Sequence, residues 1–330
     1  MPIALVQGRI AAPKADLLRA FAPEGWEVQV WDPAEDAPEA FPAMAERADV
    51  VIGGAPPTDW PATPALKLFQ IPWTGYDFTA PEKMPAGVPV ANTFEHETAI
   101  AEYAFAAMLE WEIGLRKLDA DFRKGGWGGQ GVGGSATHGE LLGKTLGVLG
   151  YGHIGHEAAV RAKAFGMNVI GVRRSAKPCP PELDWLGQGD RLDDLMAQSD
   201  YLLVACDMNE ETIGLVDADR LAKMKPTGVL INVARGKVVD EEALWDALSN
   251  KRIGGAVIDV WYNYPSPDAP DVWPSNRPFQ ELDNVILSPH RSAVTEAMHA
   301  RRWRFVASQL ARISAGEAPL NVVFEGTGPA

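Results

Sequence analysis

The sequence is poor in cysteine, has no excess of positive charge and contains no long apolar run. Its 330 residues include two cysteines, at positions 179 and 206, too few for a disulfide framework or a structural zinc site. The 30 Lys and Arg against 44 Asp and Glu give a formal net charge of −14, which argues against nucleic acid or an anionic membrane as the main partner. No stretch approaches the roughly 18 apolar residues that span a bilayer, and the first residues do not resemble a signal peptide. We therefore expect a cytoplasmic protein that binds neither nucleic acid nor membrane.

The remaining composition is that of an ordinary globular protein, with 46% hydrophobic and 22% charged residues. The length suggests two domains. Short apolar runs typical of strands alternate with helix-like patterns in the first hundred residues and again between about 145 and 289. This alternation predicts an α/β fold with parallel sheets covered by helices on both faces.

Three other segments stand out between and after these α/β series. The longest helical pattern runs from about 98 to 117, and a glycine-rich connector follows at 125–134. One more helix, at about 294–315, and a short tail end the sequence. His153 and His156 lie three residues apart, but no further ligand shares a metal-like spacing with them, so we expect no metal site.

A glycine motif predicts a dinucleotide site in the second α/β series. The strand-like run 145–149 leads directly into Gly150, Gly152 and Gly155, spaced as G-x-G-x-x-G, and a helical pattern follows. In such a loop the first glycine allows a tight turn, the second lets a pyrophosphate approach the backbone, and the third lets the helix pack on the strand. The N–H groups at the helix start then face the phosphates.

The next strand-like run, 167–172, is followed by Arg173, Arg174 and Ser175. A carboxylate about twenty residues after the glycines would bind the ribose hydroxyl of NAD. Two guanidinium groups and a hydroxyl instead suit a 2′-phosphate, because arginine pairs with phosphate through two parallel hydrogen bonds. We therefore expect NADP to be preferred, with NAD possible. The alternative is a solvated basic loop.

Across nearly its whole length the sequence resembles the D-isomer-specific 2-hydroxyacid dehydrogenase family, which includes glyoxylate/hydroxypyruvate reductases and phosphoglycerate dehydrogenases. The shared segments, in the family's order, include Gly75-Tyr-Asp77, the glycine loop, Ile231-Asn-Val-Ala-Arg235-Gly236, Asp259-Val260 and Ser288-Pro-His290. The resemblance implies two doubly wound parallel-sheet domains with a cleft between them. A flavodoxin-like substrate domain would comprise residues 1–97 and 291–330, and a Rossmann dinucleotide-binding domain residues 98–290. It also implies a homodimer with its interface on the dinucleotide domain.

The resemblance implies catalytic roles for Arg235, His290 and Tyr264, and a cofactor-binding role for Asp259. Arg235 follows a strand-like run, where doubly wound folds bind ligands, and would hold the carboxylate and carbonyl oxygen of a 2-oxoacid. His290 would be the acid/base that protonates the new alcohol, which suits its near-neutral pKa. Asp259 would accept a hydrogen bond from the nicotinamide carboxamide. The alternatives are an ordinary ion pair for Arg235, a core histidine for His290 and a loop cap for Asp259.

The sequence departs from the family at the partner of the histidine. The family has a Glu five residues after the equivalent of Asp259, and here that residue is Tyr264. A phenol is neutral at pH 7 and cannot raise the pKa of His290 by charge, although it can orient the ring. We predict that His290 titrates lower than in relatives and that reduction weakens as pH rises through neutrality. Asp268 or Asp271 could instead approach the histidine.

The resemblance also implies contacts to substrate and cofactor. Backbone N–H groups of Thr74 and Gly75 would hold the substrate carboxylate. Trp73 and Tyr76 would line the pocket, unless they pack in the core. The cofactor would contact His153, Ile154, Cys206, Val233 and Ala234, with burial of the thiol as an equal interpretation of Cys206.

These inferences predict an NADP-dependent reductase of a small 2-oxoacid, such as glyoxylate or hydroxypyruvate, that forms the D-2-hydroxyacid. Two alternatives follow from Tyr264. One is hydride transfer like that of formate dehydrogenases, which lack the Glu and protonate no product. The other is a nucleotide-sensing protein with little turnover, although Arg235 and His290 favour an enzyme.

Overall fold

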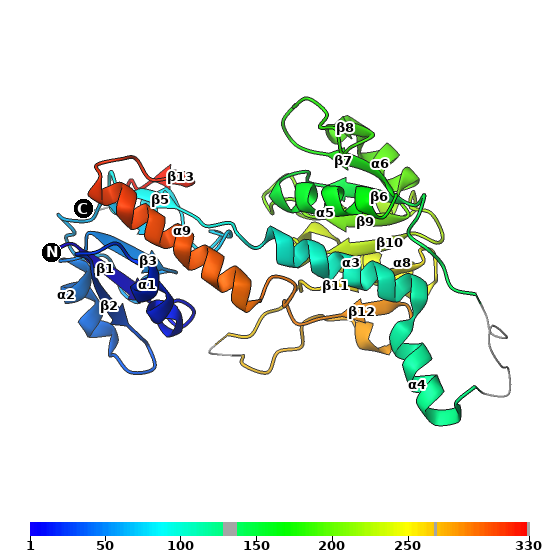
Figure 1. Ribbon diagram of the computed structural model, residues 1–330, viewed down its shortest axis with the longest axis horizontal. Coiled ribbons are helices and arrows are strands. Elements are labelled where there is room, and N and C mark those ends of the chain that lie inside the picture. The colour runs from blue at the N-terminus through cyan, green and yellow to red at the C-terminus, as the bar shows by residue number, and fades with distance from the viewer. Residues whose placement is uncertain (128–136, 267–268, 329–330) are drawn as a thin grey trace. The chain divides into compact units, whose positions relative to one another are not determined.

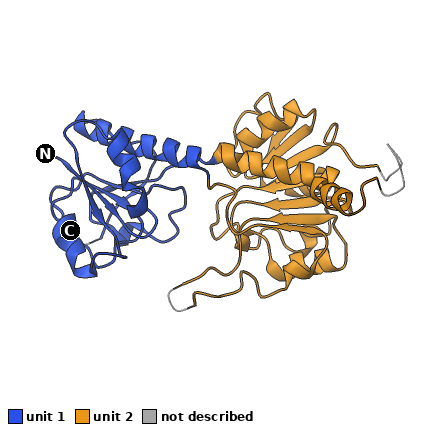
Figure 2. Cartoon of the chain, turned by 60° about the horizontal axis from the view of Figure 1, so that its bottom comes forward, with its two compact units in different colours: residues 1–96, 295–330 blue, residues 97–294 orange. Residues whose placement is uncertain are grey.

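The computed structural model describes residues 1–127, 137–266 and 269–328. The chain forms two compact units, coloured blue and orange in Figure 2. Unit 1 consists of residues 1–96 and 295–330, and unit 2 of residues 97–294. Within the described ranges, no helix has the length and apolar character needed to cross a membrane.

Unit 1 is built on a six-stranded sheet in the order β13-β5-β4-β3-β1-β2 (Figure 1). Its strands are β1 (Ile3–Gln7), β2 (Glu27–Trp31), β3 (Val50–Gly53), β4 (Leu68–Gln70), β5 (Pro89–Ala91) and β13 (Val322–Glu325). Its helices are α1 (Ala15–Phe21), α2 (Phe41–Ala45) and α9 (Glu296–Ser314), with 3-10 helices at Ala12–Lys14, Pro38–Ala40 and Pro81–Lys83.

Strand β1 shows why both faces of this sheet are covered. Successive side chains of a strand point to opposite faces. Leu5 belongs to a core cluster with Phe41 of α2, whereas Ala4 and Val6 belong to another with Leu310 of α9. The apolar side chains at successive positions from Ala4 to Val6 therefore each lie in a core on their own side of the sheet, where burial of one large side chain contributes about 1.5–3 kcal/mol.

The edge strand β13 departs from the expected parallel pairing, because it runs antiparallel to β5. After α9 the chain turns at Gly316, which has a φ of +71°, and doubles back beside the helix. There the buried Gln309 amide accepts from the Leu320 N–H group at 3.0 Å and donates to the Leu320 carbonyl at 2.8 Å. The chain thus enters the sheet in the reverse direction.

Unit 2 contains a seven-stranded sheet in the order β12-β11-β10-β9-β6-β7-β8, in which every described pairing is parallel. The strands are β6 (Thr145–Leu149), β7 (Asn168–Val172), β8 (Trp185–Gly187), β9 (Tyr201–Val204), β10 (Val229–Asn232), β11 (Gly255–Ile258) and β12 (Val285–Leu287). The strand order reverses between β6 and β9, and open α/β sheets bind ligands at such a point, beyond the carboxyl ends of the strands.

Except for α4, which extends away from the sheet, the helices of unit 2 pack around this sheet (Figure 1). They are α3 (Glu97–Ile113), α4 (Leu115–Gly125), α5 (His153–Ala164), α6 (Leu192–Gln198), α7 (Ala218–Leu221) and α8 (Glu241–Ser249), with 3-10 helices at Gly189–Arg191, Gly236–Val238 and Phe279–Glu281.

The predicted helix over 98–117 is wrong at its C-terminal end. Helix α3 ends at Ile113, Gly114 adopts a φ of +64°, and α4 begins at Leu115. A glycine tolerates this left-handed conformation without steric cost, so the chain bends here. Helix α4 buries none of its residues. Most of the predicted glycine-rich connector, residues 128–134, lies outside the described residues.

Candidate active site

The glycine loop connects β6 to α5 and uses its three glycines differently. Gly150 has a φ of +93°, and a Cβ there would lie 2.4 Å from the backbone N and Cα of Cys206. A Cβ on Gly155 would lie 2.8 Å from Cγ1 of Val148, so this glycine lets α5 pack on β6. A Cβ on Gly152 would meet no atom within 4 Å. The backbone at Gly152 is thus open to a ligand at the start of a twelve-residue helix, as a pyrophosphate requires.

In this loop the side chains of Tyr151 and Ile154 pack against the protein, whereas that of His153 is exposed. Tyr151 is buried, and its hydroxyl donates to Glu182 at 2.5 Å. Burial, and then the Glu182 carboxylate, raise the pKa of Tyr151. His153 begins α5 with its Nδ1 4.0 Å from Oε1 of Glu97. Ile154 packs against the core of unit 2. A ligand at this loop therefore meets the backbone and the exposed His153 side chain.

The neighbouring strands place three more predicted cofactor residues at the same sheet edge. Cys206 follows β9 and packs against Gly150, and burial, with a smaller effect of Asp207, raises the pKa of its thiol to about 11. Val233 and Ala234 follow β10 and are buried. The Val233 N–H group donates to the Val204 carbonyl at 3.3 Å. Strands β9, β10 and β6 are thus held together at the carboxyl edge.

Arg173 lies at the carboxyl end of β7, beside β6. One Nη donates to Ser175 Oγ at 3.3 Å. Its Nε is buried and has no hydrogen-bond partner within the described part of the chain. A buried donor without a partner is costly, by about 1–3 kcal/mol, and a bound phosphate oxygen would remove that cost. Arg174 and Ser175 are exposed, so the cluster is accessible to a ligand.

Arg235 follows β10, and the next residue explains its close approach to the loop after β11. A Cβ on Gly236 would lie 2.3 Å from the Trp261 carbonyl oxygen, so only glycine allows the two loops to pack together. The Arg235 side chain is half-buried, and one Nη donates to the Ala234 carbonyl at 2.9 Å.

Tyr264 and His290 form the central contact of the site. The hydroxyl of Tyr264 lies 3.0 Å from Nδ1 of His290 and accepts the Trp261 N–H group at 3.1 Å. Burial lowers the pKa of His290, the Arg235 charge lowers it further, and the Asp259 carboxylate opposes both. Burial raises the pKa of Tyr264, so its hydroxyl stays protonated. A neutral phenol therefore faces the histidine at the place the sequence analysis assigned to Tyr264.

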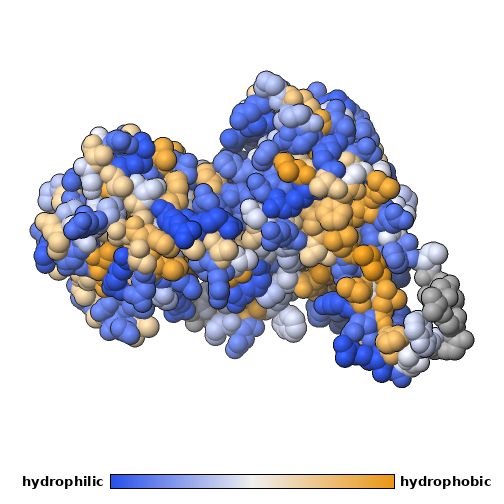
Figure 3. Space-filling view, viewed as in Figure 1, coloured by the Kyte–Doolittle hydropathy of each residue, from blue (hydrophilic) through white to orange (hydrophobic). Residues whose placement is uncertain are grey.

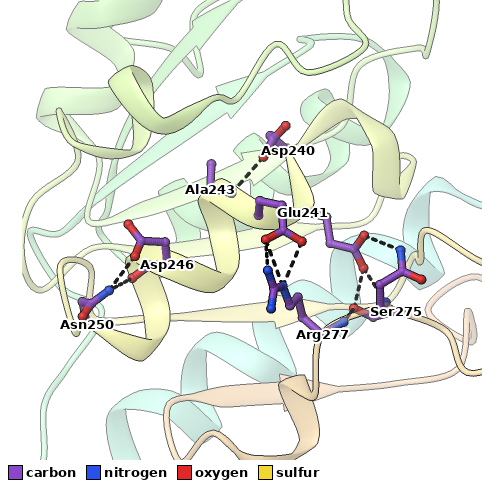
Figure 4. Close-up of polar contacts among 9 residues, drawn as sticks. Asp240, Glu241, Ala243, Asp246, Asn250, Ser275 and Arg277 are labelled. Carbon is purple, nitrogen blue, oxygen red and sulfur yellow. Dashed lines mark hydrogen bonds and ion pairs between the residues drawn. The ribbon is translucent and has the colours of Figure 1, made fainter.

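The loop that carries Tyr264 is anchored at its far end to helix α8 (Figure 4). Glu241 accepts hydrogen bonds from Ser275 Oγ at 2.6 Å and from the Asn276 N–H group at 2.7 Å. Arg277 pairs with Glu242 through its Nε at 2.8 Å. Of the two carboxylates considered as alternative partners of the histidine, Asp271 is exposed and Asp268 lies outside the described residues.

Asp259 follows β11 and is completely buried. Its Oδ1 accepts the Arg291 N–H group at 2.8 Å and its Oδ2 the Ser292 N–H group at 3.0 Å. The carboxylate thus caps the loop that carries His290, which was the alternative interpretation of this residue. Its predicted contact with a nicotinamide carboxamide stays a prediction.

In unit 1 the predicted carboxylate-binding loop follows β4. Asn92 Nδ2 donates to the Thr74 carbonyl at 2.8 Å, and Thr74 Oγ donates to the Thr93 carbonyl at 3.0 Å. Among the described residues, the N–H groups of Thr74 and Gly75 have no acceptor. These two donors are available to an anion.

The two aromatic residues of this loop have packing partners. The Trp73 ring lies 6.1 Å from that of Phe78 and belongs to the periphery of a core cluster. The Tyr76 ring lies 6.2 Å from that of Phe324 and is 42% exposed. Packing, the alternative interpretation, therefore accounts for Trp73, while Tyr76 keeps an accessible edge.

Sequence reasoning missed three residues around the histidine loop. Trp261 donates its indole N–H to the Ser288 carbonyl at 2.8 Å, and the Tyr103 hydroxyl contacts Ser288 Oγ at 2.7 Å. Tyr103 lies on α3, 185 residues before Ser288, and no local pattern signals a contact over that separation.

A glycine loop at a switch point, with Arg235, Tyr264 and His290 along the same edge, defines a dinucleotide-dependent oxidoreductase.

Comparison with known proteins agrees with this class. The family model described as D-isomer specific 2-hydroxyacid dehydrogenase, NAD binding domain, matches residues 105–292. A glyoxylate reductase of Thermococcus onnurineus is 32% identical over 320 residues, covering 91% of this chain and 90% of the relative. A glyoxylate reductase of Pyrococcus furiosus is 31% identical over 338 residues, covering 94% and 95%.

Among solved structures, a D-isomer specific 2-hydroxyacid dehydrogenase from Xanthobacter autotrophicus Py2, in complex with NADPH and MES, has a TM-score of 0.78. It is 27% identical, and the match covers 97% of this chain and 98% of that one. The chain therefore belongs to the D-isomer-specific 2-hydroxyacid dehydrogenase family, whose members carry out NAD(P)-dependent interconversion of 2-oxoacids and 2-hydroxyacids. The predicted family and the prediction of two α/β domains are confirmed.

Proposed function

We propose that this protein reduces a small 2-oxoacid, such as glyoxylate or hydroxypyruvate, to the D-2-hydroxyacid, with unit 1 as the substrate domain and unit 2 as the dinucleotide-binding domain. The observation that carries the proposal is the meeting of Tyr264 and His290, in the loops after β11 and β12, with Arg235 after the adjacent β10. The similarity to two glyoxylate reductases supports the choice of substrate.

Each residue has a distinct role in this reaction. The nicotinamide, when bound, supplies the hydride to the carbonyl carbon. Arg235 binds the substrate carboxylate and carbonyl oxygen and stabilises the negative charge that develops there. His290 donates a proton from Nε2 to that oxygen, because Nδ1 faces Tyr264. The free N–H groups of Thr74 and Gly75 bind the carboxylate.

The first experiment measures the loss of NADPH or NADH absorbance on mixing the protein with glyoxylate or hydroxypyruvate. We expect turnover that Arg235→Ala and His290→Asn reduce by about a hundredfold or more, while both variants still bind the cofactor. Unchanged turnover in Arg235→Ala would refute its role. Cofactor binding without turnover of either substrate, or of bulkier 2-oxoacids, would point to a nucleotide-sensing protein.

We also propose that NADP is the preferred cofactor, because Arg173, Arg174 and Ser175 line the end of β7 and the buried Nε of Arg173 lacks a partner among the described residues. Loss of one charged hydrogen bond costs about 1.5–3 kcal/mol. Arg173→Ala should therefore weaken NADPH binding at least about tenfold and leave NADH binding unchanged. Arg191, which pairs with Asp194 at 2.6 Å, offers a control: Arg191→Ala should affect neither. Equal dissociation constants for NADPH and NADH would remove the preference.

A homodimer is the third part of the proposal. Helix α4 buries no residue of its own, yet it exposes Leu115, Leu118 and Phe122 along one face. Figure 3 shows apolar side chains gathered over this helix, and such patches mark protein–protein contacts. We expect light scattering to give the mass of a dimer, and Leu118→Asp to give a monomer. Ile213→Asp, at another exposed apolar residue of unit 2, should leave the mass unchanged. A monomeric parent protein would refute this part.

A further inference from the structure

His290 adopts a backbone conformation that is unfavourable for histidine. Its φ is +56°, in the left-handed region that favours glycine. Such a conformation persists only where the surrounding contacts determine it. Because the ring reaches the reaction from this backbone, whatever holds residues 288–292 also positions the acid/base.

The carboxylate of Asp259 holds the residues after the histidine. It accepts the N–H groups of Arg291 and Ser292, at 2.8 Å and 3.0 Å. These are the two peptide groups that follow His290. Asp259 is itself fixed at the end of β11, where its N–H group donates to the Asn232 carbonyl at 3.1 Å.

Ser288 ties the residues before the histidine to the same carboxylate. Its hydroxyl donates to Oδ1 of Asp259, and its carbonyl accepts the indole N–H of Trp261 at 2.8 Å. The loop is therefore fastened to Asp259 on both sides of His290. The Ser288 hydroxyl has a single proton, and it uses this proton in the hydrogen bond to Asp259.

Tyr103 completes this chain of hydrogen bonds from helix α3. Its hydroxyl lies 2.7 Å from Ser288 Oγ. Since the Ser288 proton is directed to Asp259, the Tyr103 hydroxyl must be the donor in this contact. Burial raises the pKa of Tyr103, so the donor keeps its proton over the working pH range. The Tyr103 ring packs against the core of unit 2, which fixes the hydroxyl.

We propose that Tyr103 is a positioning residue for His290, acting through the Ser288 hydroxyl and the Asp259 carboxylate. Tyr103 orients the Ser288 hydroxyl toward Asp259, and Asp259 holds the strained backbone of the histidine. The expected effect on kcat rests on the proposed reductase function. The expected effect on the position of the His290 ring does not. Tyr103, on α3, does not itself touch the reacting groups.

Tyr103→Phe and Ser288→Ala test the chain from its two sides. Each should lower kcat for 2-oxoacid reduction about tenfold or more, because a small displacement of a catalytic group has effects of that size, while KM for NADPH stays unchanged. The double variant should be no slower than Ser288→Ala, since the loss of the Ser288 hydroxyl already breaks the contact that Tyr103→Phe removes. Additive losses, or an unchanged kcat in both single variants, would overturn the proposal.

Tyr201→Phe is the matched control. Tyr201 is even more deeply buried than the partly buried Tyr103, and it donates its hydroxyl to Glu112 of the same helix α3, but it belongs to a separate contact. Its variant should lose stability without losing kcat. An equal fall in kcat in Tyr103→Phe and Tyr201→Phe would show a merely structural role.

A second readout does not need turnover. The protein has six histidines, and comparison with His290→Asn assigns the ring resonances of His290 by NMR. These resonances should shift or broaden in Tyr103→Phe and Ser288→Ala, and stay unchanged in Tyr201→Phe. If they move but no variant or parent turns over a 2-oxoacid, the proposed function fails and this inference stands. If they do not move, the inference fails.

Discussion

At the scale of single residues, the chemistry depends on what faces Nδ1 of His290. The Tyr264 oxygen already accepts the Trp261 N–H group, so its own proton can point to Nδ1 when the ring is neutral. When the ring is protonated, Nδ1–H can donate to the remaining lone pair of that oxygen. The phenol thus orients both protonation states, but it carries no charge to favour the protonated one.

The pH dependence of reduction follows from this arrangement. Proton donation requires the protonated ring, and burial together with Arg235 holds the pKa of His290 below its ordinary value despite the opposing Asp259 carboxylate. The rate of reduction should therefore fall as pH rises through this lowered pKa. Tyr264→Glu should move the fall to higher pH, because a carboxylate beside the ring stabilises the imidazolium. The measurement is kcat/KM against pH.

Tyr264→Phe is the control, since it removes the hydrogen bond without adding charge. It should lower the rate and leave the fall at a pH close to that of the parent. A flat profile from about pH 6 to 9 in the parent protein, which spans the usual range of histidine, would contradict the assignment of His290 as the acid.

Alanine substitutions at Gly150 and Gly152 should have different effects on stability and on cofactor binding. Gly150→Ala would place a Cβ 2.4 Å from the Cys206 backbone at a φ of +93°, and should lower the free energy of unfolding by at least about 1–3 kcal/mol. Gly152→Ala meets no protein atom within 4 Å, so it should keep the stability but weaken NADPH binding. Thermal unfolding and cofactor titration of both variants check this. Equal stability losses would contradict it.

At the scale of elements, helix α8 anchors the loop that carries Tyr264. Glu241→Ala removes the acceptor of Ser275 and Asn276 and should lower the free energy of unfolding by about 1–3 kcal/mol. Glu242→Ala breaks only the ion pair with Arg277, in which the Arg277 and Glu242 side chains are 44% and 60% exposed, and should cost less stability than Glu241→Ala. Chemical denaturation compares the two. A larger loss in Glu242→Ala would overturn the ranking.

The sequence patterns predicted which segments form helices and strands better than they predicted where a helix ends or in which direction a strand runs. The strand, glycine turn and helix around Gly150 follow from local rules, whereas the position of Tyr264 beside His290 was expected from the resemblance to the family. The end of α3 at Gly114 was missed because the apolar spacing continues into α4. The antiparallel β13 was missed because apolar runs do not encode direction. The Tyr103–Ser288 contact could not be predicted, because it depends on packing between distant segments.

At the scale of the whole molecule, the two units have separate cores and should respond differently to ligand. A cofactor that binds the glycine loop and Arg173 stabilises the native form of unit 2 by about 2.7 kcal/mol at a hundredfold excess over its dissociation constant. Hydrogen exchange should therefore slow in residues 145–260 on addition of NADPH, with β1 to β4 of unit 1 unchanged. Equal protection of both sheets would contradict the assignment of cofactor binding to unit 2.

Both chain ends belong to unit 1 (Figure 2), and this has a consequence for biosynthesis. When a ribosome has made β1 to β5, the partners of that sheet, α9 and β13, do not yet exist. About 10–40 s of translation, for roughly 200 residues at 5–20 per second, must pass before Trp303, Val306 and Leu310 can cover the exposed face. Unit 2 emerges whole in that interval and can fold first. The nascent N-terminal sheet is thus the part of this protein most in need of a chaperone.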